Sequence, residues 1–224
     1  MQERTKHLQN LYQGRFSEEA KKAKARLWKV LAQNYFQRWI QPSDTILDLG
    51  CGFGEFLNHV QCARRIGVDL NPDSQKFLQP GIEFHVGDAI RLDFLPDNTV
   101  DLVFISNLME HLPDKREVER MLGEVWRVLK SGGHLVSMGP NLRFLPGEYW
   151  DFWDHHVPIT DRSLTEILEV LGFRIVDCIP RFLPYTTCSS LPQNPWLVKW
   201  YLKLSWIWPL LGRHFLIRAS KPRE

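Results

Sequence analysis

Short apolar runs alternate with longer amphipathic stretches along most of the chain. Seven runs have the length and the Ile, Val and Phe content typical of β-strands, at residues 45–49, 64–69, 82–86, 100–106, 134–139, 173–182 and 214–219. Four of them lack a polar face, which indicates strands buried on both sides. Strands of this kind that alternate with helices predict an α/β fold, with a seven-stranded, mostly parallel sheet and helices on both faces.

Amphipathic stretches predict three helices, at 17–39, 114–129 and 160–171. The second is expected to end at the Ser-Gly-Gly sequence of 131–133 and the third at Gly172, because glycine favours helix C-termini. A further helical pattern opens at Glu55, directly after a glycine-rich turn. In a parallel sheet flanked by helices, ligands bind at the carboxyl ends of the strands.

Length and composition are consistent with one domain. The chain has 224 residues, of which 44% are hydrophobic, enough for a substantial core. Its four cysteines include no Cys-x-x-Cys pair, which favours a reducing, cytoplasmic environment. The polar first ten residues are unlike a secretory signal, and the longest apolar run, 204–211, is too short to span a bilayer.

Charge is distributed unevenly along the chain. Residues 1–40 hold nine Lys or Arg against three acids, and residues 196–224 hold six against one, whereas the whole chain has a net charge of only +2. The middle of the chain is therefore acidic. An acidic body argues against a nucleic-acid groove at the active site, so no nucleic-acid partner is expected.

The stretch ILDLGCGFGEFL predicts a strand, a glycine turn and a cradle for a ligand that approaches the backbone closely. Its glycines, Gly50, Gly52 and Gly54, do not match the G-x-G-x-x-G spacing of dinucleotide sites. The carboxylates of Asp48 and Glu55 on either side disfavour a pyrophosphate. They favour a ligand with an ammonium or sulfonium group, such as S-adenosylmethionine, over NAD.

Five motifs then occur in a fixed order, namely ILDLGCGFG, GVDLNP, VGDA, FISNLMEHL and EVWRVLKSGGHL. In this order they resemble the class I S-adenosylmethionine-dependent methyltransferases, and most closely the small-molecule enzymes that modify quinones and saccharides. The resemblance covers residues 45–140 and implies a Rossmann-like fold whose last strand is antiparallel. A single domain would then comprise an N-terminal helical cover (1–40), a cofactor-binding core (41–140) and substrate-side elements (141–224).

The resemblance implies a set of residues that bind S-adenosyl-L-methionine: Asp48, Gly50, Cys51, Gly52, Gly54, Asp69, Leu70, Asp88, Ala89, Asn107 and Leu108. The glycines would admit the methionine part, and Asp48 would hold its amino group directly or through water. Cys51 has no adjacent basic partner, so packing is favoured over a nucleophilic role.

The other implied contacts involve the rest of the cofactor. Asp69 would accept both ribose hydroxyls, and it follows Gly50 by the spacing expected of a ribose acid. Asp88 and Ala89 would flank adenine, while Asn107 would border the sulfonium together with its neighbour Leu108. Helix capping is the alternative interpretation for both Asp69 and Asp88.

The stretch YWDFWDHHVPIT follows the fifth strand and contains candidate catalytic residues. A hydroxyl acceptor needs a general base, and His155 or His156, oriented by Asp154, are the candidate catalytic residues. Two alternatives stay open: the histidines cap the helix near 160, or they bind a metal together with Asp151 and Asp154. No metal is favoured for the site. His111 is expected to form part of the cofactor-pocket wall.

Two further segments could contact substrate. Residues 185–212 carry Trp196, Trp200 and two more tryptophans among cations, a combination typical of membrane-interface segments. Packing on the sheet edge or a homodimer contact is the alternative. The stretch LYQGRF resembles a mobile cover, which would place Tyr12 and Arg15 near the cofactor carboxylate.

The sequence therefore predicts an enzyme that transfers a methyl group to a small-molecule acceptor, most plausibly at oxygen on a saccharide, a quinone-like or a lipid-linked compound. A non-catalytic module that binds S-adenosylmethionine is the alternative. The expected location is cytoplasmic, with the 185–212 segment as a candidate contact at the inner membrane surface.

Overall fold

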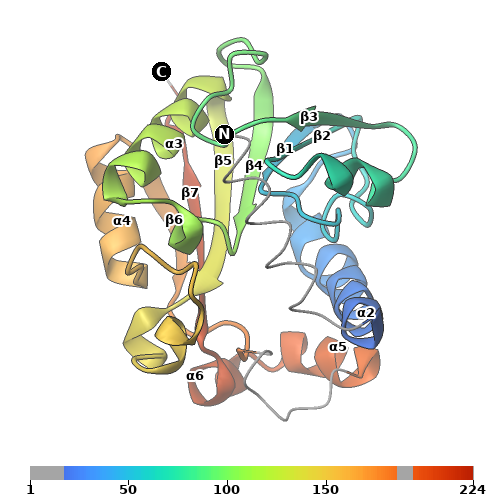
Figure 1. The fold of residues 1–224 in the computed structure, drawn as a ribbon, viewed down its shortest axis with the longest axis vertical. Coiled ribbons are helices and arrows are strands. Elements are labelled where there is room, and N and C mark those ends of the chain that lie inside the picture. Colours follow the sequence, from blue (N-terminus) through green and yellow to red (C-terminus); the bar gives the residue numbers. More distant parts are fainter. Residues whose placement is uncertain (1–17, 186–193, 224) are drawn as a thin grey trace.

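The computed structural model describes residues 18–185 and 194–223, and these form a seven-stranded sheet flanked by helices (Figure 1). The strands are β1 (Thr45–Leu49), β2 (Arg64–Asp69), β3 (Ile82–Val86), β4 (Val100–Ser106), β5 (Leu129–Pro140), β6 (Arg174–Ile179) and β7 (His214–Ser220). The α-helices are α2 (Glu18–Asn34), α3 (Lys115–Val128), α4 (Asp161–Val170), α5 (Pro195–Lys203) and α6 (Trp208–Leu211).

The strand order is β3-β2-β1-β4-β5-β7-β6. The pairs from β3 through to β5 are all parallel, whereas β7 runs antiparallel to both of its neighbours, β5 and β6. The prediction of a mostly parallel sheet with an antiparallel last strand is confirmed. The strands β1, β2 and β3 follow one another toward one edge of the sheet, whereas β4 and the later strands lie on the other side of β1. Ligands bind beside such a change in strand order in folds of this kind.

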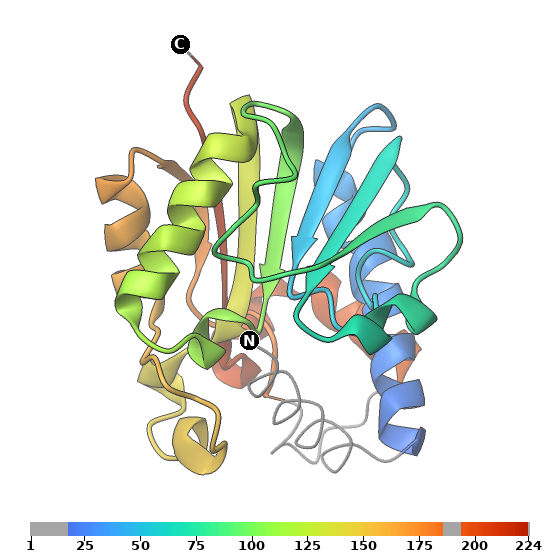
Figure 2. The same cartoon turned by 45° about the horizontal axis from the view of Figure 1, so that its top comes forward.

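Both faces of the central strands are buried, which explains why these strands lack a polar side. Along β1, Leu47 and Leu49 belong to the core under α3 and α4, while Ile46 belongs to the core under α2 and α5. The same alternation occurs in β4, where Val103 and Phe104 lie in different cores. Figure 2 shows α3 on one face of the sheet and α2 on the other.

Two helix boundaries follow from capping side chains. Asp114 accepts the N–H groups of residues 116 and 117 at the start of α3, and Thr160 forms a reciprocal capping box with Ser163 at the start of α4. The histidines before α4 therefore do not supply its cap, contrary to one of the sequence interpretations. Gly172, with φ of +94°, follows the end of α4 as expected.

Several predicted boundaries were wrong. Residues 52–59 form consecutive hydrogen-bonded turns in place of the helix expected from Glu55 onwards. The first helix ends at Asn34 and continues as a 3₁₀ turn over Phe36–Trp39. α3 passes directly into β5 at Leu129, so the glycine pair at 132–133 lies inside a strand and not at a helix end.

No helix in the described part of the chain is long and apolar enough to cross a membrane. The proposed cover at 11–16, with Tyr12 and Arg15, lies outside the described residues, as does the first part of the tryptophan-containing segment, 186–193.

Candidate active site

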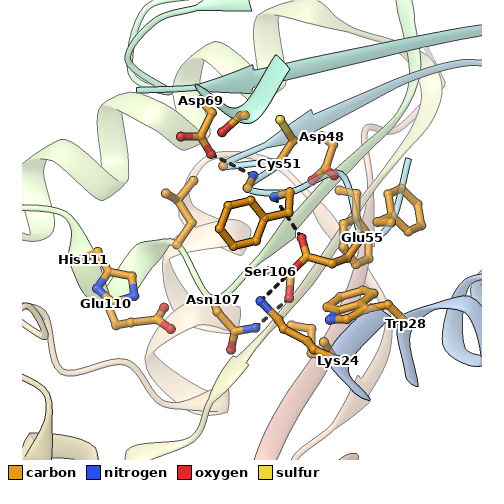
Figure 3. Close-up of a pocket in the computed structure, with 18 of the residues that line it drawn as sticks. Lys24, Trp28, Asp48, Cys51, Glu55, Asp69, Ser106, Asn107, Glu110 and His111 are labelled. Atoms are coloured by element: carbon orange, nitrogen blue, oxygen red, sulfur yellow. Dashed lines mark hydrogen bonds and ion pairs between the residues drawn. The ribbon is translucent and has the colours of Figure 1, made fainter. Parts of the chain in front are cut away.

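A cavity of about 650 Å³ opens at the carboxyl ends of the central strands. Its walls come from the turns after β1, β2, β3 and β4 and from α2, together with the segment after β5 and the start of β7 (Figure 3). All the predicted cofactor-binding residues except Gly54 line this cavity: Asp48, Gly50, Cys51, Gly52, Asp69, Leu70, Asp88, Ala89, Asn107 and Leu108.

The glycine turn is held in place by its own hydrogen bonds. The N–H groups of Gly50 and Cys51 donate to the carbonyl of Val68, and that of Gly54 donates to Cys51. The side chain of Asp69 accepts the N–H of Gly52 at 2.8 Å. Phe53 N–H completes the turn, since it donates to the Glu55 carboxylate at 3.1 Å.

These hydrogen bonds decide what the turn can bind. A phosphate-binding loop presents unused N–H groups to its ligand, whereas all five N–H groups from Gly50 to Gly54 are occupied here, two of them by carboxylates. The turn is therefore no anion site, which agrees with the exclusion of a pyrophosphate. It offers backbone surface and negative charge instead.

Three carboxylates surround the turn, those of Asp48, Glu55 and Asp69 (Figure 3). Burial, reinforced by the charges of Glu55 and Asp69, raises the pKa of Asp48 well above its usual range. Burial also raises the pKa of Asp69, although the N–H groups of Asn71 and Gly52 counteract this effect. A cationic ligand would relieve the repulsion, since an opposite charge stabilises ionised carboxylates.

Asn107 lies between the glycine turn and Glu110 in the cavity wall, and Leu108 follows it (Figure 3). Asn107 has a φ of +51°, in the left-handed region that asparagine tolerates better than most residues, and its N–H donates to Met138 of β5. The Leu108 side chain packs against Gly50, where an added Cβ would lie 2.9 Å from the leucine Cδ1. This contact fixes the position of the glycine turn relative to the end of β4.

The other end of the cavity holds Glu110, His111 and His155, whose candidate ligand atoms all lie within 4.8 Å of one another. Burial raises the pKa of Glu110. Burial alone would lower the pKa of His111, but the hydrogen bond with Asp154 and the charge of Glu110 outweigh it, so the pKa is raised. The Asp154 carboxylate lies 3.2 Å from His111 Nδ1.

The structure separates the two candidate catalytic histidines. His155 is buried and lines the cavity, whereas His156 is exposed and does not line it. Asp151 is also exposed and away from the cavity, while Asp154 is buried behind His111. Sequence reasoning paired Asp154 with the adjacent histidines, but the ion pair that the structure shows for it joins it to His111, 43 residues earlier.

Two alternatives for single residues are also resolved. No helix follows Asp88, whose carbonyl accepts the N–H of Arg91 in a turn, so the helix-cap interpretation was wrong. Burial raises the pKa of the Cys51 thiol, with Asp48 and Asp69 adding to the effect. A thiol in these surroundings stays protonated, in accord with a packing role.

Sequence reasoning missed a second wall of the cavity. Lys24 and Trp28 of α2 reach it from the opposite side, and Lys24 forms an ion pair with Glu55 at 2.8 Å (Figure 3). Trp28 packs edge-on against Phe104 of β4. The amphipathic pattern of α2 indicated a packed face in the sequence, but the cavity beside it depends on how α2 lies against the sheet.

The comparisons with known proteins agree with this geometry. Residues 47–137 match the family described as a methyltransferase domain. A solved S-adenosylmethionine-dependent methyltransferase from Archaeoglobus fulgidus is 27% identical, with a TM-score of 0.66 over 88% of this chain and 94% of that one. Residues 47–137 thus match a methyltransferase domain, and the fold around them is that of a solved S-adenosylmethionine-dependent methyltransferase.

Curated relatives of the methyltransferase domain include a demethylmenaquinone methyltransferase from Symbiobacterium thermophilum, 31% identical over 59% of this chain and 57% of that protein. Another is a 2-methyl-6-phytyl-1,4-hydroquinone methyltransferase from Synechocystis, 30% identical over 59% of this chain and 47% of that protein. The chain thus spans about half the length of these relatives. S-Adenosylmethionine is the cofactor that the matched domain, the solved relative and the acidic glycine turn support.

Proposed function

We propose that this chain transfers the methyl group of S-adenosylmethionine to an oxygen atom of a small molecule, with a quinone-like, saccharide or lipid-linked acceptor. The observation that carries this proposal is the division of one cavity into two ends. The acidic glycine turn lies at one end and the Glu110, His111 and His155 cluster at the other, with Asn107 in the wall between them.

Methyl transfer from a sulfonium is an in-line displacement, in which correct placement of the acceptor supplies much of the rate gain. The bound cofactor supplies the methyl electrophile. This chain's residues would hold the cofactor at Asp48 and Asp69, while the buried Tyr185 and the partly buried Phe152 would limit the access of water. An oxygen acceptor must also lose a proton, for which a histidine at the acceptor end is suited.

His155 suits this role better than His156, because only His155 lines the cavity. The names of the two curated relatives support the quinone-like option, since each names a quinone or hydroquinone. The cavity wall near His155 is compatible with a flat ring, because Phe152 stacks on the His155 imidazole and Tyr185 lies edge-on to Phe152. Aromatic rings of the acceptor would pack against these side chains.

A lipid-linked acceptor is supported by an exposed apolar surface formed by α5, α6 and the 3₁₀ turn between them. We call it the tryptophan surface. The exposed fractions of its tryptophans are 64% for Trp196, 48% for Trp200 and 68% for Trp206. Lys199 and Lys203 lie on α5 together with the first two tryptophans. This combination is typical of peripheral contact with an anionic membrane, and we propose a cytoplasmic protein that makes such a contact.

A product assay tests the proposed function directly. Purified protein is incubated with S-adenosylmethionine carrying a labelled methyl group and a panel of hydroquinones, catechols and saccharides. Labelled product and S-adenosylhomocysteine in equal amounts are expected for at least one hydroxyl-bearing acceptor. Tight cofactor binding by calorimetry without product from any acceptor would favour the alternative, a non-catalytic S-adenosylmethionine-binding module.

A further inference from the structure

Two histidines and one carboxylate meet at the acceptor end of the cavity, a combination that suits divalent transition metals such as Fe(II), Mn(II), Co(II) and Zn(II). Glu110 and His111 come from the 3₁₀ turn after β4, and His155 comes from the segment after β5. The exposed fractions of Glu110 and His155 are only 3% and 8%, so the cluster is not a set of surface groups that meet by chance.

Each donor can reach a common point with small movements. Their ligand atoms lie within 4.8 Å of one another, and metal–ligand bonds of about 2.1 Å place neighbouring ligands roughly 3 Å apart. Side-chain rotations that move the ligand atoms by about 1–2 Å would therefore bring all three within bonding distance of one ion. The remaining coordination positions would face the cavity, where the acceptor enters.

Asp154 fixes the orientation of one of the three candidate ligands, His111. Asp154 contacts His111 at Nδ1 through its carboxylate and its carbonyl, at 3.2 and 3.0 Å, so Nε2 is the ring nitrogen that would serve as the metal ligand. A histidine that is fixed through one nitrogen by a carboxylate or carbonyl is the usual arrangement behind a metal ligand.

The backbone joins the two segments that carry the donors. The N–H groups of His156 and Val157 both donate to the Glu110 carbonyl, at 2.7 and 3.2 Å. The Tyr149 hydroxyl donates to the carbonyl of Val157 from within the core. The spacing between Glu110 and His155 is thus set by hydrogen bonds that do not involve the ligand atoms themselves.

We propose that Glu110, His111 and His155 bind one divalent transition-metal ion, which orients a hydroxyl-bearing acceptor for methyl transfer. This use of the site rests on the proposed function. Coordination lowers the pKa of the acceptor hydroxyl, whose proton leaves to water. The oxygen then forms the bond to the methyl carbon, and the carbon–sulfur bond breaks with its electron pair remaining on sulfur. In this arrangement His155 acts as a metal ligand and no longer as the general base, because coordination by the metal favours loss of the acceptor proton.

The first test measures metal binding without turnover. Untagged protein is freed of metal with a chelator and titrated with Co(II), followed by calorimetry and by the visible absorption of the bound ion. One equivalent of Co(II) is expected to bind, with a visible d–d spectrum that differs from that of hydrated Co(II). Absence of binding, or bound Co(II) with the spectrum of the hydrated ion, would overturn the proposal.

Substitutions at the proposed ligands test where Co(II) binds. Glu110→Gln and His155→Ala should each weaken Co(II) binding at least about tenfold, whereas His156→Ala, which alters the exposed neighbouring histidine, should bind as the parent does. Circular dichroism and thermal melting establish that each variant is folded. Equal binding by all three variants would place the metal elsewhere and reject the assignment.

S-Adenosylhomocysteine binding distinguishes failure of the metal site from failure of the proposed function. It is measured by calorimetry on the same metal-free protein. Intact nucleoside binding without Co(II) binding rejects the metal site alone. Co(II) binding at the three residues without any nucleoside binding rejects the methyltransferase proposal but leaves the metal site standing.

Discussion

Asp69 has three hydrogen-bond partners within the chain. Its carboxylate accepts the N–H groups of Gly52 and Asn71, each at 2.8 Å, and also hydrogen-bonds with the Ser74 side chain, which fixes its orientation at the cavity wall. An ionised carboxylate offers about four lone-pair positions, so acceptor capacity remains for a ribose hydroxyl. The same residue can therefore hold the turn in shape and bind the ligand that the turn admits.

Asp69→Ala should weaken S-adenosylhomocysteine binding at least about tenfold, because hydrogen bonds to a charged group contribute about 1.5–3 kcal/mol. Calorimetry on the parent and the variant measures this difference. Asp93→Ala removes an exposed carboxylate outside the cavity and serves as the control. A folded Asp69→Ala protein with parental affinity would remove Asp69 from the cofactor site.

His214 links pH to stability. It is buried at the start of β7, and burial lowers its pKa to about 4 from the ordinary 6.5, although hydrogen bonding to the backbone of Leu183 and Pro184 counteracts part of the effect. The folded state thus keeps this imidazole neutral where the unfolded chain would protonate it. Its contribution to stability is present above about pH 6.5 and is lost as the pH falls toward 4.

Between pH 7.5 and pH 5 the free energy of unfolding should fall by about 2 kcal/mol because of His214 alone. Urea denaturation at both pH values measures the change in the parent and in His214→Phe, which cannot take up a proton. The variant should show a smaller loss of stability over this interval. The same loss in both proteins would show that His214 is not the group responsible.

The turn after β1 illustrates what an element contributes beyond its residues. Gly52 has a φ of +53°, and a Cβ added there would meet only the Glu55 carboxylate, at 3.4 Å, beside the cavity. Gly81 also has a positive φ, +85°, but an added Cβ would have no neighbour within 4 Å, and it does not line the cavity. The two glycines thus share a positive φ, which would strain any residue with a Cβ, and they differ in what they face.

Gly52→Val should lose at least about tenfold in S-adenosylhomocysteine affinity, because a branched side chain would occupy space that the ligand needs and would strain the turn. Gly81→Val carries comparable backbone strain without touching the site, and it should keep parental affinity at somewhat lower stability. Calorimetry and thermal melting separate these effects. Equal affinity in the two variants would show that the turn does not cradle the ligand.

Strands and helices could be predicted from the sequence where neighbouring residues alone mark both the element and its ends. The seven strands were located because each contains a short apolar run between helical patterns or turns, and α4 was located because its cap and its terminal glycine bound an amphipathic pattern. The helix expected at Glu55 does not form, because the carboxylate turns back to accept the N–H of Phe53. A local pattern does not reveal such a competing hydrogen bond.

The acceptor end of the cavity was less predictable, because it depends on contacts between distant segments. His155 was singled out as a candidate, but its partners in the cluster, Glu110 and His111, lie more than 40 residues earlier, and only the adjacency of β4 and β5 brings them together. Lys24 and Trp28 likewise reach the cavity only because α2 packs across the sheet. Sequence spacing carries no information on such pairings without the strand order.

Charge and apolar surface are combined on one side of the whole molecule. α5 packs against α2, and Leu202 and Trp208 anchor the α5–α6 region in the core, so the tryptophan surface is held in place while Trp196, Trp200 and Trp206 remain exposed. The basic C-terminal region offsets an acidic body. A membrane with anionic lipids would attract this side and repel the rest, which orients the protein as it approaches.

If the tryptophan surface contacts membranes, the parent should sediment with anionic liposomes at low salt and be released at high salt, because each cation near such a surface contributes about 1 kcal/mol. A Lys199→Glu, Lys203→Glu double variant should lose this binding. A Lys115→Glu, Arg116→Glu variant makes the same change in charge on α3, which covers the other face of the sheet, and should still bind. Equal sedimentation of both double variants would indicate attraction by net charge alone. If the parent fails to bind at low salt, a soluble acceptor is favoured, and light scattering would then test whether the exposed tryptophans pair two copies of the chain.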